Sequence, residues 1–281
     1  MIPVAAAASE LAGRTEVRSR VDAREQTLSW LLRAGAGMCF VGHGAFGILR
    51  KPEWLPYFEV VGIPAGLAAA LMPIIGFVDI AVGIAVFLSP RPVFLLYMAG
   101  WALWTALLRP LAGESVWETL ERAGNYGVPF ALLLLAGIPA TCGAWFARMA
   151  TGPVSIQRLR QTATTLRLTT AMLLAGHGAL GALTGKALLA THYAAIGVPP
   201  SAVVVVGWAE MALAAAVLLR PGVALLLFVC AWKLATESLF PISGARMWEF
   251  IERGGSYAAP LGAAVLIVWL RRQPVSSGGV P

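Results

Sequence analysis

The sequence predicts an all-α integral membrane protein with eight transmembrane helices, arranged as two parallel four-helix repeats. The first observation is composition: 58% of the residues are hydrophobic, only 12% are charged, and the mean hydropathy is +0.76. A soluble domain carries roughly a quarter charged residues. The second observation is a series of apolar stretches, each long enough to cross roughly 30 Å of hydrocarbon. The third is an internal duplication.

The duplication is clearest in two motifs. The segment 42–47, Gly-His-Gly-Ala-Phe-Gly, returns at 176–181, and the segment 117–129 returns at 248–260 with 7 of 13 positions identical. Every ionisable residue of the longer motif is kept. Because each repeat has an even number of crossings, we expect both halves to share one orientation and to be related by an axis along the membrane normal.

The helices follow from the apolar stretches. We expect them at 29–49, 65–88, 92–110, 116–138, 165–184, 200–219, 222–241 and 247–270, with the fourth broken or kinked around Pro129. The domains are then a polar tail (1–27), a first repeat (28–148), a linker (149–163), a second repeat (164–272) and a C-terminal tail (273–281).

The basic residues indicate the orientation. The net charge is +7, but the arginines gather at helix ends and form no stripe interleaved with aromatic residues, which argues against nucleic acid. The positive-inside rule places both termini and the linker in the cytoplasm. The first 27 residues are too polar for a cleavable signal. We therefore expect a multi-pass protein of a bacterial-type inner membrane, with the lipid bilayer as its partner.

The fourth helix of each half carries a polar stripe. Glu118, Arg122 and Asn125 lie at i, i+4 and i+7, and an ion pair between the first two leaves Glu121 in excess. The stripe, with Tyr126, returns as Glu249, Glu252, Arg253, Ser256 and Tyr257. Charges in a bilayer must face protein or water. Three interpretations stay open: a salt-bridge network, the wall of a small-molecule or redox site, and a proton or ion path.

Two histidines and two acids also repeat. His43 and His177 are flanked by glycines, which leave room for a flat ring, while Asp79 and Glu210 lie deep in the second helix of each half. At about 1.5 Å per residue, His43 lies about 9 Å below the outer surface and Asp79 about 20 Å, so contact between them would need a bent helix or a water-filled path. Three interpretations of His43 and His177 stay open: a hydrogen-bonded packing residue, a haem ligand, and a donor to a quinone carbonyl.

Other residues carry less information. Cys39, Cys142 and Cys230 have neither motif spacing nor counterparts in the other repeat, so we interpret them as packing residues. No pair of ligating residues has a metal-site spacing, and we expect no metal centre. Trp101 and Thr105, which return as Trp232 and Thr236, are interpreted as packing.

The halves differ at a few charged positions. Arg109 and Glu114 face Phe240 and Ala245, and Lys233 and Glu237 replace Ala102 and Ala106. If two sites exist, we expect them to have diverged.

The chain resembles the DoxX-like family of four-helix membrane proteins. The residues that carry this are Leu31-Leu32-Arg33, Gly42, Gly47, Phe58 with Gly62-Ile63-Pro64, the segment 76–83 around Asp79, and Pro90-Arg91-Pro92, with Arg167, Gly176, Gly197-Val198-Pro199, Glu210 and Arg220-Pro221 in the second half. The likeness covers about 28–112 and 162–242, so the chain looks like a fused pair. The resemblance implies a membrane subunit of a redox system, such as thiosulfate:quinone oxidoreductase. Only the acid of the second helix matches a polar position of the family pattern.

The expected function is a redox-associated subunit that binds a quinone or haem b near the outer face and works with a redox partner protein. His43 and His177 would donate to or ligate the ligand, and Glu118, Arg122, Asn125, Tyr126, Glu249, Arg253 and Tyr257 would orient it. Glu121 and Glu252 would relay protons. The alternatives are a proton- or ion-coupled transporter that uses Asp79 and Glu210, and a non-catalytic membrane scaffold.

Overall fold

The computed structural model is built from helices. It describes residues 4–149 and 152–272, with the backbone alone over 4–23, and these residues form no strand. The predicted C-terminal tail 273–281 lies outside the described residues. An all-α fold is therefore confirmed for the part of the chain that is described.

The first half contains one long helix followed by shorter ones. Its elements are α1 (Val4–Ile48), η1 (Pro52–Trp54), α2 (Leu55–Glu59), α3 (Ala65–Leu88), α4 (Pro92–Leu111), α5 (Trp117–Glu121), α6 (Ala123–Ala136) and α7 (Cys142–Phe146). The second half contains α8 (Ile156–Ala182), α9 (Ala187–Ala194), α10 (Ala202–Leu219), α11 (Val223–Ile242), α12 (Met247–Ile251) and α13 (Gly254–Arg271).

Several helices suit a bilayer. Five are long and apolar enough to cross a membrane: residues 24–48 of α1, α3, α4, α10 and α11. The pair α8 and α9, bent by 88° at its break, makes a sixth if it is one span. Large apolar side chains point outward from them, and Leu219, Val205 and Phe77 are 81%, 71% and 68% exposed. Such faces would be unstable in water, so the fold is that of a multi-pass membrane protein.

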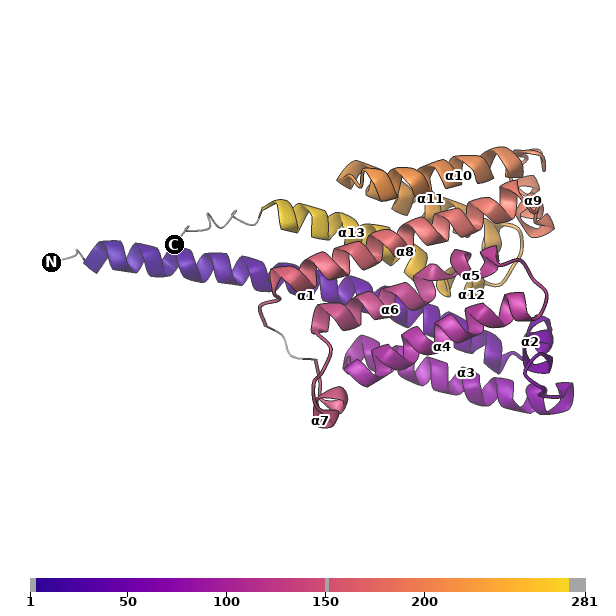
Figure 1. The fold of residues 1–281 in the computed structure, drawn as a ribbon, viewed down its shortest axis with the longest axis horizontal. Helices are drawn as coiled ribbons and strands as arrows, with labels where there is room; N and C mark the ends of the chain where they lie inside the picture. Colours follow the sequence, from indigo (N-terminus) through magenta and orange to yellow (C-terminus); the bar gives the residue numbers. More distant parts are fainter. Residues whose placement is uncertain (1–3, 150–151, 273–281) are drawn as a thin grey trace.

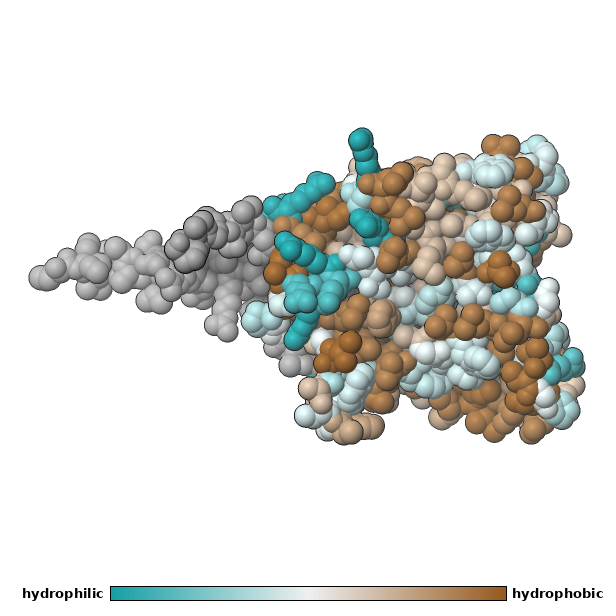
Figure 2. All heavy atoms as spheres, in the orientation of Figure 1, coloured by the Kyte–Doolittle hydropathy of each residue, from teal (hydrophilic) through white to brown (hydrophobic). Residues whose placement is uncertain are grey.

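The helices run roughly along one direction. The start of α1 and the end of α13 lie at the same end of the bundle, while α2, α9 and α12 lie at the opposite end (Figure 1). Figure 2 shows hydrophilic residues gathered where α1 leaves the bundle and a mainly hydrophobic surface beyond them. We call the end of the bundle that holds the start of α1 and the end of α13 the terminal end, and the opposite end the loop end.

Several predicted boundaries are wrong. The expected linker 149–163 is helical from Ile156, where α8 begins, and the expected helix 247–270 is divided into α12 and α13. The first helix begins at Val4 and therefore runs through most of the expected polar tail. The fourth segment breaks at Arg122, between α5 and α6, while Pro129 lies inside α6. The Arg122 guanidinium and the Tyr126 hydroxyl donate to the carbonyl oxygens of Glu118 and Thr119, at 3.2 and 3.1 Å. These side chains satisfy the carbonyl groups that a continuous helix would have bonded.

Glycines set the register between α1 and α3. A Cβ atom added at Gly44 would lie 2.5 Å from the carbonyl oxygen of Gly76, and one added at Gly37 would lie 3.2 Å from that of Gly83. The same close approach recurs between Gly178 and Gly207. Only glycine lets two helix backbones pack this closely.

Glycines also bring the two halves together. A Cβ atom at Gly42 would overlap the backbone of Glu252, and one at the equivalent Gly176 would overlap that of Glu121. Gly124 and Gly255, which are equivalent to one another, face each other directly. Equivalent positions of the sequence repeat thus make equivalent contacts across the junction.

The contact between Gly124 and Gly255 gives a direct test. In Gly255→Ala the new methyl group would overlap the Gly124 carbonyl, so we expect a loss of about 1–3 kcal/mol, as for other overpacked sites. Gly100→Ala, in α4, places its methyl group in open space and should be neutral or stabilising. Unfolding of both variants in detergent measures the difference. Equal stabilities would contradict this packing.

Candidate functional site

Each half contains a histidine bonded to a buried carboxylate. Nδ1 of His43 lies 2.9 Å from Oδ2 of Asp79, and Nδ1 of His177 bonds Oε2 of Glu210. The expectation that depth separates His43 from Asp79 is therefore wrong. The close contacts at glycines set the register of α3 against α1, and in this register Asp79 lies beside His43.

The two pairs differ in their third member. The Tyr97 hydroxyl donates to Asp79 at 3.4 Å, whereas the indole N–H of Trp232 donates to Glu210 at 2.8 Å. Trp101 is the counterpart of Trp232, and its indole N–H is buried without a partner in the described part of the chain. The first half therefore has an unused donor next to its pair.

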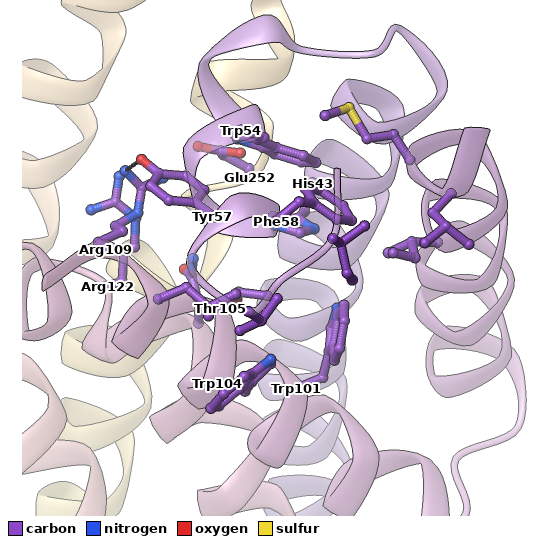
Figure 3. Close-up of a pocket in the computed structure, with 17 residues that line it drawn as sticks. His43, Trp54, Tyr57, Phe58, Trp101, Trp104, Thr105, Arg109, Arg122 and Glu252 are labelled. Atoms are coloured by element: carbon purple, nitrogen blue, oxygen red, sulfur yellow. Dashed lines mark hydrogen bonds between the residues drawn. The ribbon is translucent and has the colours of Figure 1, made fainter. Parts of the chain in front are cut away.

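A pocket of about 270 Å³ opens beside His43 (Figure 3). Its walls come from both halves, and most of its side chains are aromatic or aliphatic. The lining residues are His43, Trp54, Tyr57, Phe58, Val61, Ile63, Leu71, Met72, Ile75, Trp101, Trp104, Thr105, Leu108, Arg109, Arg122, Asn125 and Glu252. Of the predicted site residues, the structure brings His43, Arg122, Asn125 and Glu252 to this pocket.

Packing and hydrogen bonding fix the imidazole of His43. Its ring stacks on Trp54 with centroids 4.5 Å apart, and Asp79 accepts from Nδ1. Nε2 has no partner within the described residues and is the ring nitrogen left for a ligand. The side chain is 23% exposed, whereas that of His177 is only 7% exposed.

The polar stripe forms an ion-pair network. Arg122 lies 2.6 Å from Glu118 and 2.5 Å from Glu121, which confirms the predicted i,i+4 pair and also gives Glu121 a partner. In the second half, Arg253 lies 3.0 Å from Glu249 and 3.2 Å from Glu252.

Two lysines connect these networks across the junction. Lys51 of the first half lies 2.6 Å from Glu249 of the second, and Lys186 of the second lies 2.5 Å from Glu118 of the first. The lysines are equivalent in the repeat. Each half therefore supplies a cation to the carboxylate of the other.

The two predicted tyrosines contact backbone. The hydroxyls of Tyr126 and Tyr257 donate to the carbonyl oxygens of Thr119 and Phe250, each at 3.1 Å. Neither tyrosine lines the pocket. Their hydroxyls stabilise the helix breaks.

The halves diverge around the pocket. Arg109 lies 3.2 Å from Glu114 and donates to the Tyr57 hydroxyl at 2.8 Å. In the second half the counterpart of Arg109 is Phe240, whose ring packs against His192 with centroids 4.2 Å apart.

The second half contains buried ion pairs that the described part of the first half lacks. Lys233 and Glu237, both almost fully buried, lie 2.6 Å apart, and Glu237 pairs with Arg253 at 2.8 Å. The second half thus has an internal ion-pair chain, and an aromatic contact at the position where Arg109 lines the pocket of the first half.

Sequence reasoning missed several pocket residues. Trp54, Tyr57, Phe58 and Trp104 were not predicted as site residues, and Trp101 was interpreted as packing. A usable signal was present: Arg109 and Glu114 occur only in the first half, and Arg109 lines the pocket. Within the described residues, no group of three or more His, Cys, Asp and Glu side chains could hold a metal ion.

The rim of the pocket is a hydrogen-bonded triad of Arg109, Tyr57 and Glu114. Burial raises the pKa of Tyr57 to about 12, so its hydroxyl stays protonated and donates to Glu114. Burial would raise the pKa of Glu114, but the Tyr57 hydroxyl and the Arg109 guanidinium outweigh it and the pKa is lowered. The carboxylate is therefore ionised at neutral pH.

This triad makes stability depend on pH. A carboxylate whose pKa is lowered by folding stabilises the fold fully at pH values above its pKa in the unfolded chain, about 4.3. This contribution is lost as the pH falls through its pKa in the folded protein. We expect Glu114→Gln to lower the melting temperature in detergent at pH 7, and we expect this deficit to shrink as the pH falls below about 4.3. A deficit that stays constant with pH would contradict the triad.

No family model, curated protein or solved structure matches this chain. The resemblance to the DoxX-like family stays a prediction carried by the residues quoted above. The pocket beside His43 is the observation from which a function is argued.

Proposed function

We propose that the chain crosses a bacterial-type inner membrane eight times, with both termini in the cytoplasm, as a tandem DoxX-like protein. In this arrangement α5 with α6 and α12 with α13 each form one crossing. An axis along the membrane normal relates the halves. The equivalent contacts made by Gly42 and Gly176, and by Lys51 and Lys186, support that relation.

We propose further that the first half binds a quinone-like molecule as part of a redox system. One observation carries this: a pocket of about 270 Å³ in which aromatic rings surround His43, whose orientation Asp79 fixes. Small-molecule sites are mostly apolar, with a few converging polar groups.

Size and shape favour a single substituted ring. The volume is slightly below the usual range for ligand pockets, which suits a single ring better than a tetrapyrrole macrocycle. The ring of His43 is also stacked on Trp54, which leaves no open slot on that side for a porphyrin. The pocket therefore favours a quinone over haem b.

The histidine–carboxylate pair suits both redox forms of such a ligand. With Nδ1–H donating to Asp79, neutral His43 accepts at Nε2 from a quinol hydroxyl, and protonated His43 donates from Nε2 to a quinone carbonyl. The Asp79 carboxylate compensates the positive charge of the protonated form. Glu252 is placed to exchange protons with a ligand, and the electrons would come from a redox partner protein.

Matched histidine variants test this function. A hydrogen bond to a charged group contributes about 1.5–3 kcal/mol, so His43→Ala should weaken binding of a short-chain ubiquinone analogue about 10- to 100-fold. His177→Ala also removes the histidine partner of a buried carboxylate, but His177 does not line the pocket, so the affinity of this variant should be unchanged. Quenching of tryptophan fluorescence in detergent measures both.

The competing functions make distinct predictions. A transporter would titrate Asp79, which has no exposed side-chain area and contacts His43, so Asp79→Asn should abolish pH-dependent flux into liposomes. A scaffold would keep its partner in every polar variant. If the His43 and His177 variants bind the quinone analogue with equal affinity, and Asp79→Asn abolishes flux, the pocket is a transport site and not a quinone site.

A further inference from the structure

A second, smaller cavity lies at the terminal end, far from the loop-end pocket. Its volume is about 140 Å³, and it is lined by Ser29, Arg33, Leu88, Ser89, Pro90, Arg148 and Met149. We propose that it binds the phosphate group of an anionic membrane lipid. The proposal depends on the chain being a membrane protein and is independent of quinone binding.

Arg33 is the fixed cation of this cavity. It is 8% exposed, its Nε donates to the carbonyl oxygen of Val86 at 3.1 Å, and an Nη donates to that of Phe87. These carbonyls belong to the last turn of α3. A guanidinium carries five N–H groups, so donors remain for an anion.

Two further groups in the cavity lack protein partners. The Ser89 hydroxyl oxygen is buried and has no hydrogen-bond partner within the described residues. Arg148 is exposed and forms neither an ion pair nor a hydrogen bond with any described side chain or backbone group. A phosphate oxygen would satisfy the hydroxyl, and its charge would attract both guanidinium groups.

The segment that carries Arg148 is held over the cavity. The backbone N–H of Met149 donates to the carbonyl oxygen of Pro90 at 3.0 Å, and the Arg91 guanidinium donates to that of Phe146 at 3.0 Å. Glu25 is the acidic residue of α1 nearest in sequence to Arg33. It does not line the cavity, and it accepts a hydrogen bond from the Val154 N–H at 2.7 Å. The local charge is therefore positive.

The position of the cavity favours a lipid over a soluble phosphate. It lies where α3 ends and α4 begins, at the level where helices leave the hydrocarbon. Beside it Leu88 is 69% exposed, and the half-exposed rings of Trp30 and Phe87 pack with centroids 5.4 Å apart. Tryptophan is typical of the membrane interface. The cavity holds a headgroup, and acyl chains would lie along this apolar surface.

Native mass spectrometry of the full chain in mild detergent tests the site, with phosphatidylglycerol and phosphatidylcholine as probes. We expect phosphatidylglycerol to bind more tightly and Arg148→Ala to weaken it about fivefold, as expected for one basic residue near a headgroup. Arg148→Lys should keep most of the affinity. Arg271→Ala removes an exposed arginine at the same end, outside the cavity, and should leave it unchanged.

The other outcomes overturn the proposal. Equal losses in the Arg148 and Arg271 variants would mean only general attraction to basic residues. Equal binding of both lipids would exclude a phosphate-selective site. Inorganic phosphate should compete only weakly with phosphatidylglycerol. If phosphate binds through Arg148 and the lipid does not, the cavity is a site for a soluble anion.

Discussion

The close approach of helix backbones at glycines determines the rest of this structure. Gly44 against Gly76 fixes how far α3 slides along α1, and this sliding places Asp79 beside His43. A methyl group at Gly44 would shift α3 and separate the imidazole from its carboxylate. The polar chemistry of the first half is therefore a consequence of packing between small residues.

The same constraint explains why the charges lie between the halves. Gly42 lets the backbone of Glu252 approach α1, so that a carboxylate of the second half reaches the pocket of the first. Charged groups in a bilayer need protein partners. The exchanged contacts of Lys51 and Lys186 supply them across the junction, which makes each half electrostatically incomplete without the other.

The sequence predicted the helices well and the site in part. Apolar length and repetition place α3, α4, α10 and α11 within a few residues, and i,i+4 spacing identified the pair of Glu118 and Arg122. Depth counted from helix ends failed for His43 and Asp79, because it assumes that neighbouring helices end at one level. Contacts between segments that are distant in the sequence, such as the ion pair of Lys51 with Glu249, have no periodic signal in one sequence.

The two halves differ around the pocket that we propose as a ligand site. Arg109 lines the pocket of the first half, whereas its counterpart Phe240 packs against His192 in the second. The indole N–H of Trp232 donates to Glu210, whereas that of Trp101 has no partner among the described residues. Filling a polar opening with an aromatic ring adds buried apolar area and removes an unpaired donor. These changes in the second half leave its contacts with the first half in place: Glu249 still pairs with Lys51, and Glu252 still lines the pocket. The two copies of the framework thus differ at the pocket that we propose as the ligand site.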